Sequence, residues 1–97
     1  VALATDMNPG SCFSESIPLI IALSTLYMNL TTEETLTALT LNGAAALDLA
    51  NTVGSIDPGK KGDLSILSYP SYKYLPYHMG VSAIDKVVKN GNLIFQK

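Results

Sequence analysis

The opening stretch of the chain, VALATDMNPGS, constrains its fold more than any other segment. An apolar run ends at one carboxylate, Asp6, and the Asn8, Pro9 and Gly10 that follow predict a turn. The run shows no polar alternation, which is typical of a strand buried on both faces in the parallel sheet of an α/β protein. Such proteins place their chemistry where strands end. The pattern predicts a strand with an acid, Asp6, at its C-terminal end, where a functional site is expected. The alternative is that Asp6 only caps the turn.

Composition narrows the class of protein. Hydrophobic residues make up 47%, charged residues 14%, and the net charge is −2, which argues against a nucleic-acid binder and a disordered chain. Soluble domains carry about 25% charged residues, so we expect much of this surface to be covered. The apolar run 17–23 is too short for a membrane span, and the single Cys12 favours a reducing, cytoplasmic location. We expect no membrane partner.

Two helical segments follow the opening turn. Ser14 or Ser16 can cap a first helix that has Pro18 in its first turn, and apolar residues then recur at helical spacing up to Leu30.

Thr31 and Glu34 have the spacing of a capping box and predict the start of a second helix. We expect this helix to break at Asn42-Gly43, with Asn42 capping the second piece.

The remainder of the chain has β character. Leu64–Ser68 is predicted to be a strand, and Tyr69–Gly80 an irregular crossing loop because it contains two prolines. Ile84–Lys89 and Asn92–Phe95 flank Asn90-Gly91, which is a strong hairpin signal. One strand and a hairpin offer no parallel neighbour to the opening strand, so we expect further strands upstream of residue 1.

Few other side chains suggest chemistry. His78 lies in an aromatic loop, where a packing or substrate-contacting role is favoured over metal ligation, and Cys12 has no neighbouring base and is expected to fill space. One histidine and one cysteine cannot complete a metal site. The loop tyrosines could line a pocket, but clamping the loop to a surface is favoured; they are Tyr69, Tyr72, Tyr74 and Tyr77.

Three stretches resemble one enzyme family: ALATDMNPGS, the block from LTTEETL to GSIDPGKKGDLSIL, and YKYLPYHMGV with VVKNGNLI. Together they are similar to the C-terminal part of the imidazolonepropionases, within the metal-dependent amidohydrolase superfamily. The resemblance implies the end of a (β/α)8 barrel over residues 1–52, with its last strand and outer helices. Residues 53–97 would form part of a composite β-sandwich domain that ends in the hairpin.

The resemblance also implies roles for individual residues. Asp6 matches a ligand of a catalytic zinc or iron ion, and also the base that activates the attacking water. Asn8 and Gly10 match positions that contact substrate or product, and Ser11 matches a hydroxyl that contacts the ring. His78 matches a family position without an assigned catalytic role. The chain departs from the family at two positions, where phenylalanine is expected: Met7 and Met79.

The implied reaction of the parent enzyme is hydrolysis of the ring amide of 4-imidazolone-5-propanoate to N-formimino-L-glutamate, in histidine degradation. The implied partners are this small-molecule substrate, the rest of the same enzyme, and further copies in a homo-oligomer. The other metal ligands would lie outside this chain, so we expect the chain alone to be inactive. Two alternatives remain open: an amidohydrolase acting on a different cyclic amide or amine, and a non-catalytic helical interaction module.

Overall fold

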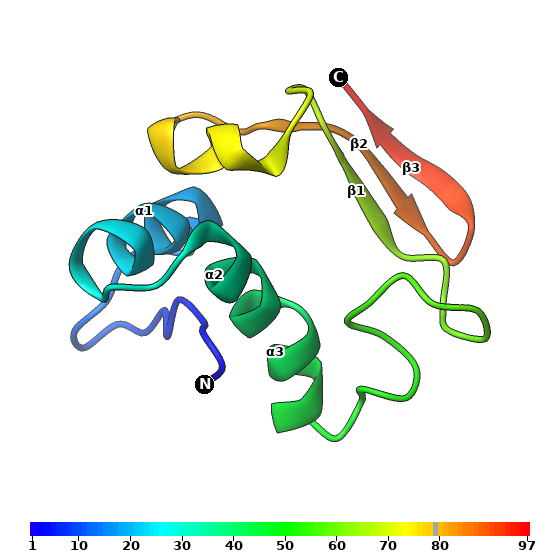
Figure 1. Ribbon diagram of the computed structural model, residues 1–97, viewed down its shortest axis with the longest axis horizontal. Coiled ribbons are helices and arrows are strands. Elements are labelled where there is room, and N and C mark those ends of the chain that lie inside the picture. Colours follow the sequence, from blue (N-terminus) through cyan, green and yellow to red (C-terminus); the bar gives the residue numbers. More distant parts are fainter. Residues whose placement is uncertain (79) are drawn as a thin grey trace.

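The helices lie together on one side of the molecule and the strands on the other (Figure 1). The computed structural model describes residues 1–78 and 80–97, so Met79 lies outside the described residues. The strands form one antiparallel sheet in the order β1-β2-β3. The chain is therefore an α/β fold with a small antiparallel sheet. In order, its elements are α1 (Ile17–Tyr27), α2 (Thr32–Leu39), α3 (Leu41–Ala46), β1 (Leu64–Leu67), the 3-10 helix η1 (Tyr72–Tyr77), β2 (Ile84–Lys89) and β3 (Asn92–Gln96).

Helix α1 begins as predicted, with Ser16 as its cap. The Ser16 hydroxyl accepts a hydrogen bond from the Leu19 N–H at 3.3 Å, and Pro18 occupies the first turn, where no donor is needed. The apolar pattern continues to Leu30, but the helix ends earlier, at Tyr27. Asn29 then takes a left-handed φ of 57°, which turns the chain toward α2.

The predicted capping box at the start of α2 is confirmed. The Thr31 hydroxyl accepts from the Glu34 N–H at 3.0 Å, and the Glu34 carboxylate accepts from the Thr31 N–H at 3.0 Å. These two bonds satisfy donors that a helix start otherwise leaves without partners. The start of α2 therefore depends on residues within one turn of sequence.

The prediction that the second helix breaks at Asn42-Gly43 is wrong. The helix is interrupted at Thr40, whose φ and ψ are −107° and −83°, and Asn42 lies inside α3. The Thr40 hydroxyl donates to the Leu36 carbonyl at 2.6 Å, a side-chain bond that competes with the helical backbone pattern. The Asn42 amide, expected to be a cap, instead donates to the Val1 carbonyl at 2.7 Å.

The predicted opening strand does not form in this structure. Residues 1–7 have no strand pairing, and their contacts with the helices include a bond from the Leu3 N–H to the Ala38 carbonyl at 3.1 Å. The only pairing recorded nearby among the described residues is the isolated bridge between Asn8 and Cys12. A strand gains its hydrogen bonds from neighbouring strands, and the strands that the structure describes all belong to the separate antiparallel sheet.

The predicted C-terminal hairpin is confirmed. Asn90 and Gly91 form its turn with φ values of 50° and 77°, the left-handed pair that a tight hairpin requires. Asp63 braces this turn, because its carboxylate accepts from the Asn90 N–H at 2.9 Å and from the Lys89 ammonium at 2.8 Å. The bonds from Lys89 and from the Asn90 N–H lower the pKa of Asp63 below its ordinary value.

The segment between β1 and β2 is more regular than predicted. It contains η1, which includes Pro76 and was expected to be irregular. The Ser71 hydroxyl accepts from the Lys73 N–H at 3.1 Å and starts the helix, and the His78 N–H donates to the Leu75 carbonyl at 3.2 Å at its end. A short 3-10 helix makes few backbone bonds, which lets it accommodate a proline near its end.

The buried core is small. Ser24 of α1 and Thr35 of α2 are both 0% exposed, and their hydroxyls are hydrogen-bonded at 3.0 Å. The buried apolar side chains are Ile21, Ala22, Ala38, Ala44 and Ala83. Among the large apolar side chains left exposed are Val1, Phe13, Leu26, Tyr27, Leu47, Ile56, Tyr77 and Ile94.

No helix in the described parts of the chain has the length and apolar character that crossing a membrane requires.

Candidate functional site

The turn after the opening segment brings the predicted site residues together. Its centre is Asn8, whose side-chain oxygen accepts hydrogen bonds from the Gly10 N–H at 2.9 Å and the Ser11 N–H at 2.8 Å. The Asn8 amide nitrogen donates to the Asp6 carbonyl at 2.7 Å. The Asn8 N–H donates to the Cys12 carbonyl at 2.7 Å and closes the loop. One side chain thus links Asp6, Gly10 and Ser11.

Asp6 stands at the start of this turn. It is exposed and has a φ of 52°, in the left-handed region that aspartate tolerates better than most residues. Left-handed backbone at a non-glycine residue is associated with functional sites, where surrounding bonds hold it in place. The bond from the Asn8 amide to the Asp6 carbonyl is such a bond.

The metal-binding capacity of the turn depends on its donor set. A carboxylate oxygen is a suitable ligand for zinc or iron. Among the described residues, however, no three histidine, cysteine, aspartate or glutamate side chains gather closely enough to hold a metal ion. The residues of this chain that the structure describes therefore do not form a metal site by themselves, and Asp6 can serve only together with ligands from elsewhere.

Cys12 has a structural environment. Its sulfur lies 3.3 Å from the Thr5 carbonyl oxygen and 3.7 Å from the Ser14 carbonyl oxygen, so its one hydrogen can be donated to either, and the residue is half-buried. These contacts tie the end of the turn to the segments on either side of it. They agree with a packing role for Cys12.

His78 and two tyrosines form an aromatic stack. The His78 ring lies 4.6 Å from the Tyr69 ring at an interplanar angle of 16°, and Tyr74 lies 5.7 Å from Tyr69 at 26°. The stack gives His78 a packing partner. Tyr72 lies apart from the stack, and its hydroxyl donates to the Glu33 carboxylate at 3.0 Å, which clamps η1 to α2.

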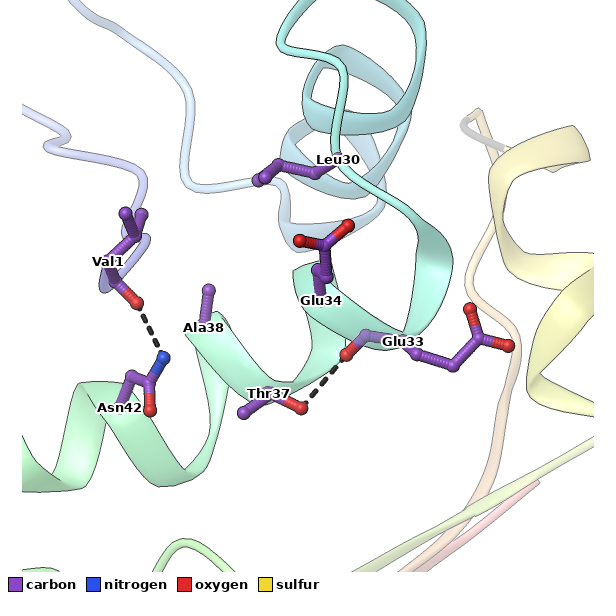
Figure 2. Close-up of a pocket in the computed structure, with 7 residues that line it drawn as sticks. All are labelled: Val1, Leu30, Glu33, Glu34, Thr37, Ala38 and Asn42. Carbon is purple, nitrogen blue, oxygen red and sulfur yellow. Dashed lines mark hydrogen bonds between the residues drawn. The ribbon is translucent and has the colours of Figure 1, made fainter.

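A shallow pocket lies between the first residue and α2 (Figure 2). Asn42 and Val1 close one end through their hydrogen bond. The pocket also contains two carboxylates, but Glu34 belongs to the capping box and Glu33 extends toward η1, where it accepts the Tyr72 bond. Both acids are therefore engaged in holding the fold.

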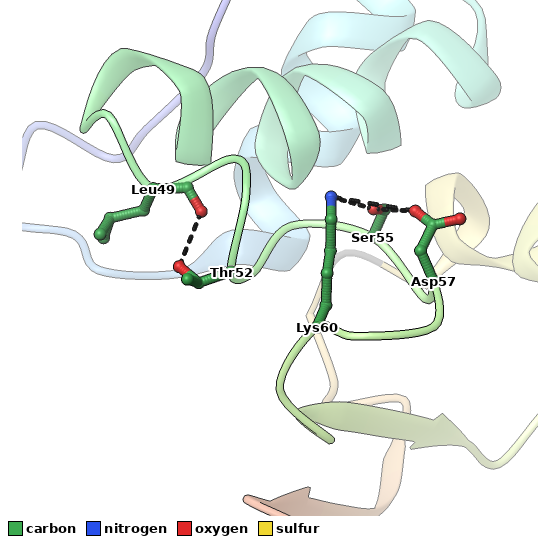
Figure 3. Close-up of polar contacts among 5 residues, drawn as sticks. All are labelled: Leu49, Thr52, Ser55, Asp57 and Lys60. Carbon is green, nitrogen blue, oxygen red and sulfur yellow. Dashed lines mark hydrogen bonds and ion pairs between the residues drawn. The ribbon is translucent and has the colours of Figure 1, made fainter.

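The loop before β1 contains a polar cluster that was not predicted from the sequence (Figure 3). The Lys60 ammonium donates to the Ser55 hydroxyl at 2.6 Å, and that hydroxyl donates to the Asp57 carboxylate. The Lys60 side chain is only 15% exposed. The alternating donor and acceptor groups close the loop around Pro58 and Gly59. In the sequence, the features that could have predicted this cluster are a serine, an aspartate and a lysine placed around a Pro-Gly turn.

Comparison with known proteins shows which protein family this chain belongs to. The sequence model of the amidohydrolase family matches residues 1–94. An imidazolonepropionase from Porphyromonas gingivalis is 60% identical over 95 residues, which are 98% of this chain and 22% of that protein. One from Clostridium tetani is 59% identical over 97 residues, 100% of this chain and 23% of that protein. The resemblance to imidazolonepropionases is thus confirmed, and the chain spans less than a quarter of those relatives' length.

A solved structure agrees with the family match. The crystal structure of an amidohydrolase from Thermotoga maritima superimposes with a TM-score of 0.69 at 27% sequence identity. The match covers 91% of this chain and 21% of that protein. The family match extends over almost every residue, and the structural match shares the same arrangement of helices and sheet. The chain belongs to the amidohydrolase family.

Proposed function

We propose that this chain forms the C-terminal part of a longer enzyme that hydrolyses the ring amide of 4-imidazolone-5-propanoate to N-formimino-L-glutamate. The observation that carries the proposal is the identity of 59–60% to proteins named imidazolonepropionase over nearly the whole chain. The match to the Clostridium tetani protein covers all 97 residues and so extends over the turn that carries Asp6. In this proposal the enzyme is cytoplasmic, acts in histidine degradation and forms a homo-oligomer.

In the complete enzyme, residues 1–52 are proposed to end a (β/α)8 barrel and residues 53–97 to form the C-terminal part of a composite β-sandwich. The opening residues would become the last barrel strand once neighbouring strands supply hydrogen bonds. Their apolar, non-alternating sequence supports this role, because both faces of a barrel strand are buried. Asp6 would then stand at the end of the barrel where amidohydrolase chemistry is expected.

Asp6 is proposed to contribute one ligand to a zinc or iron ion whose other ligands lie outside these residues. The metal would supply Lewis-acid chemistry when bound. The Asp6 carboxylate is also proposed to accept a proton from the attacking water, as a general base. Its exposure in this structure supports both roles, because the carboxylate is accessible to further groups.

The remaining residues of the turn are proposed to contact the substrate. Ser11 would offer its hydroxyl to the ring, and Asn8 and Gly10 would contribute to the binding of substrate or product. The hydrogen bonds that connect these residues support their action as one unit. Loops at strand ends commonly carry such contacts because they are exposed and held by a rigid scaffold.

Activity of the intact enzyme tests the proposal. We expect turnover of 4-imidazolone-5-propanoate that is lost in Asp6→Asn, together with bound metal in the purified wild type. Asp48→Asn is the matched control, because Asp48 is also exposed and left-handed, with a φ of 61°, but lies outside the turn. The 97-residue chain alone, supplied with zinc or iron, should show no turnover. Activity only on another cyclic amide or amine, or full activity in Asp6→Asn, would overturn the proposal.

A further inference from the structure

We propose that Asn8 is a positioning residue, which sets the location of the Asp6 carboxylate and the Ser11 hydroxyl through its own hydrogen bonds. The inference rests on the proposed function, in which Asp6 and Ser11 act on the substrate. It adds a different kind of role for Asn8, one exerted on neighbouring residues of the chain.

The hydrogen bonds of Asn8 reach both sides of the turn. Its amide nitrogen donates to the Asp6 carbonyl at 2.7 Å, and its side-chain oxygen accepts from the Ser11 N–H at 2.8 Å. The bond to Asp6 holds the backbone of a residue that has a left-handed φ of 52°. Without it, the backbone could relax to a commoner conformation and the carboxylate would move. Asn8 therefore couples the proposed acid and the proposed hydroxyl.

The bonding capacity of the Asn8 amide limits what it can offer a substrate. An amide oxygen has two lone pairs, and those of Asn8 are used by the N–H groups of Gly10 and Ser11. The Ser11 hydroxyl also lies 3.4 Å from this oxygen. One of the two amide hydrogens is used by the Asp6 carbonyl. Only one donor remains, so the principal partners of Asn8 belong to the turn.

Gly10 makes room for this arrangement. A Cβ atom added at Gly10 would meet the Asn8 side-chain oxygen at 3.2 Å, tighter than nearly all ordinary contacts of a Cβ atom. Alanine at this position would require the amide oxygen of Asn8, which accepts from two N–H groups, to shift by a few tenths of an ångström. The absence of a side chain at Gly10 therefore protects the hydrogen bonds of Asn8.

Kinetics of the intact enzyme test the role of Asn8. Misplacing reacting groups by about 1 Å can cost 100-fold in rate. We therefore expect Asn8→Ala to lower kcat by about 100-fold and to change KM by a smaller factor. Asn8→Asp keeps the oxygen that accepts from Gly10 and Ser11 but loses the bond to the Asp6 carbonyl, so it should recover only part of that loss. Asn51→Ala, a change of an exposed asparagine in another loop, should leave the kinetics unchanged.

Hydrogen exchange gives a second measurement that does not depend on turnover. Asn8→Ala should speed amide exchange at Gly10 and Ser11, which lose their acceptor, and Asn8→Asp should restore protection. In a double-mutant cycle read by amide exchange at Ser11, Asn8→Ala with Gly10→Ala should exchange no faster than Asn8→Ala alone, because the added methyl group then meets no amide.

The outcomes separate this inference from the proposed function. A rise in KM with unchanged kcat in Asn8→Ala, or unchanged exchange at Gly10 and Ser11, overturns the positioning role. A wild-type enzyme without activity on 4-imidazolone-5-propanoate overturns the proposed function, while the exchange measurement still decides whether Asn8 holds the turn.

Discussion

The Tyr72 hydroxyl donates a hydrogen bond to the Glu33 carboxylate at 3.0 Å and joins η1 to α2. The backbone hydrogen bond at Glu33 and the bond from Tyr72 lower the pKa of Glu33, while the same bond raises the pKa of Tyr72. The bond therefore stabilises the fold above the ordinary pKa of a glutamate and below that of a tyrosine. Its contribution disappears as the pH falls through the lowered pKa of Glu33 or rises through the raised pKa of Tyr72.

Replacing Tyr72 by phenylalanine tests this pH dependence. We expect Tyr72→Phe to unfold at a lower temperature than the wild type at neutral pH, and the difference to shrink at strongly acidic and strongly alkaline pH. Tyr77→Phe is the control, because Tyr77 is 83% exposed and its change should not depend on pH in this way. A Tyr72→Phe effect of constant size across the pH range would contradict the assignment.

Gly54 lets the loop before β1 pack against the break between α2 and α3. It has a φ of 99°, and an added Cβ atom would meet the Ala44 Cβ at 2.8 Å and the Thr40 carbonyl oxygen at 3.1 Å. Gly59 has a similar φ of 89° but open space around it. Gly59→Ala should cost about 1–2 kcal/mol of unfolding free energy through backbone strain alone.

Gly54→Ala should cost about 1–3 kcal/mol more than Gly59→Ala, because it also overpacks a buried contact. Urea unfolding of both variants in dilute solution measures the difference. Equal losses in the two variants would show that the loop can move away from Ala44 without cost.

The buried hydroxyl pair of Ser24 and Thr35 predicts an asymmetry between two substitutions. Ser24 also donates to the Ile21 carbonyl at 3.0 Å, so Thr35 donates to Ser24. Ser24→Ala removes the acceptor of the buried Thr35 hydroxyl and should cost about 1–3 kcal/mol of unfolding free energy. Thr35→Val keeps the shape and leaves Ser24 bonded to Ile21, so it should cost less. Equal losses, or a larger loss in Thr35→Val, would contradict this donor order.

Exposed apolar side chains predict that the 97-residue chain self-associates. Phe13 is 82% exposed, Tyr27 79% and Ile56 85%. Large apolar surfaces that remain in contact with water favour association. Sedimentation velocity at increasing concentration should show species heavier than the monomer. A single monomeric species at all concentrations would show that this surface does not drive association.

The sequence predicted the elements whose signals are local. The Ser16 cap, the Thr31 and Glu34 capping box and the Asn90-Gly91 turn were confirmed. In each case the relevant hydrogen bonds or backbone angles involve residues within a few positions of one another. The site turn was also predicted by its position, because asparagine, proline and glycine in succession favour a turn.

The hydrogen bonds within the site turn were not predicted. Spacing alone does not say that the Asn8 oxygen accepts from both Gly10 and Ser11 while its nitrogen donates to Asp6. An asparagine in a turn can face the backbone or a ligand, and only the folded geometry distinguishes these arrangements. The roles of these residues in metal and substrate binding remain proposals.

The sequence by itself determined where α1 and α2 begin, where the hairpin turns, and that Asp6 stands next to a turn, because these features depend on neighbours along the chain. Tertiary structure decided what depends on distant partners. The helix break lies at Thr40, where Gly54 approaches, and η1 forms where Tyr72 reaches Glu33. The opening segment stays unpaired because a strand needs neighbouring strands, which no local pattern of residues can supply. Asp6 is thus held by its own turn, while its proposed chemistry depends on groups beyond these residues.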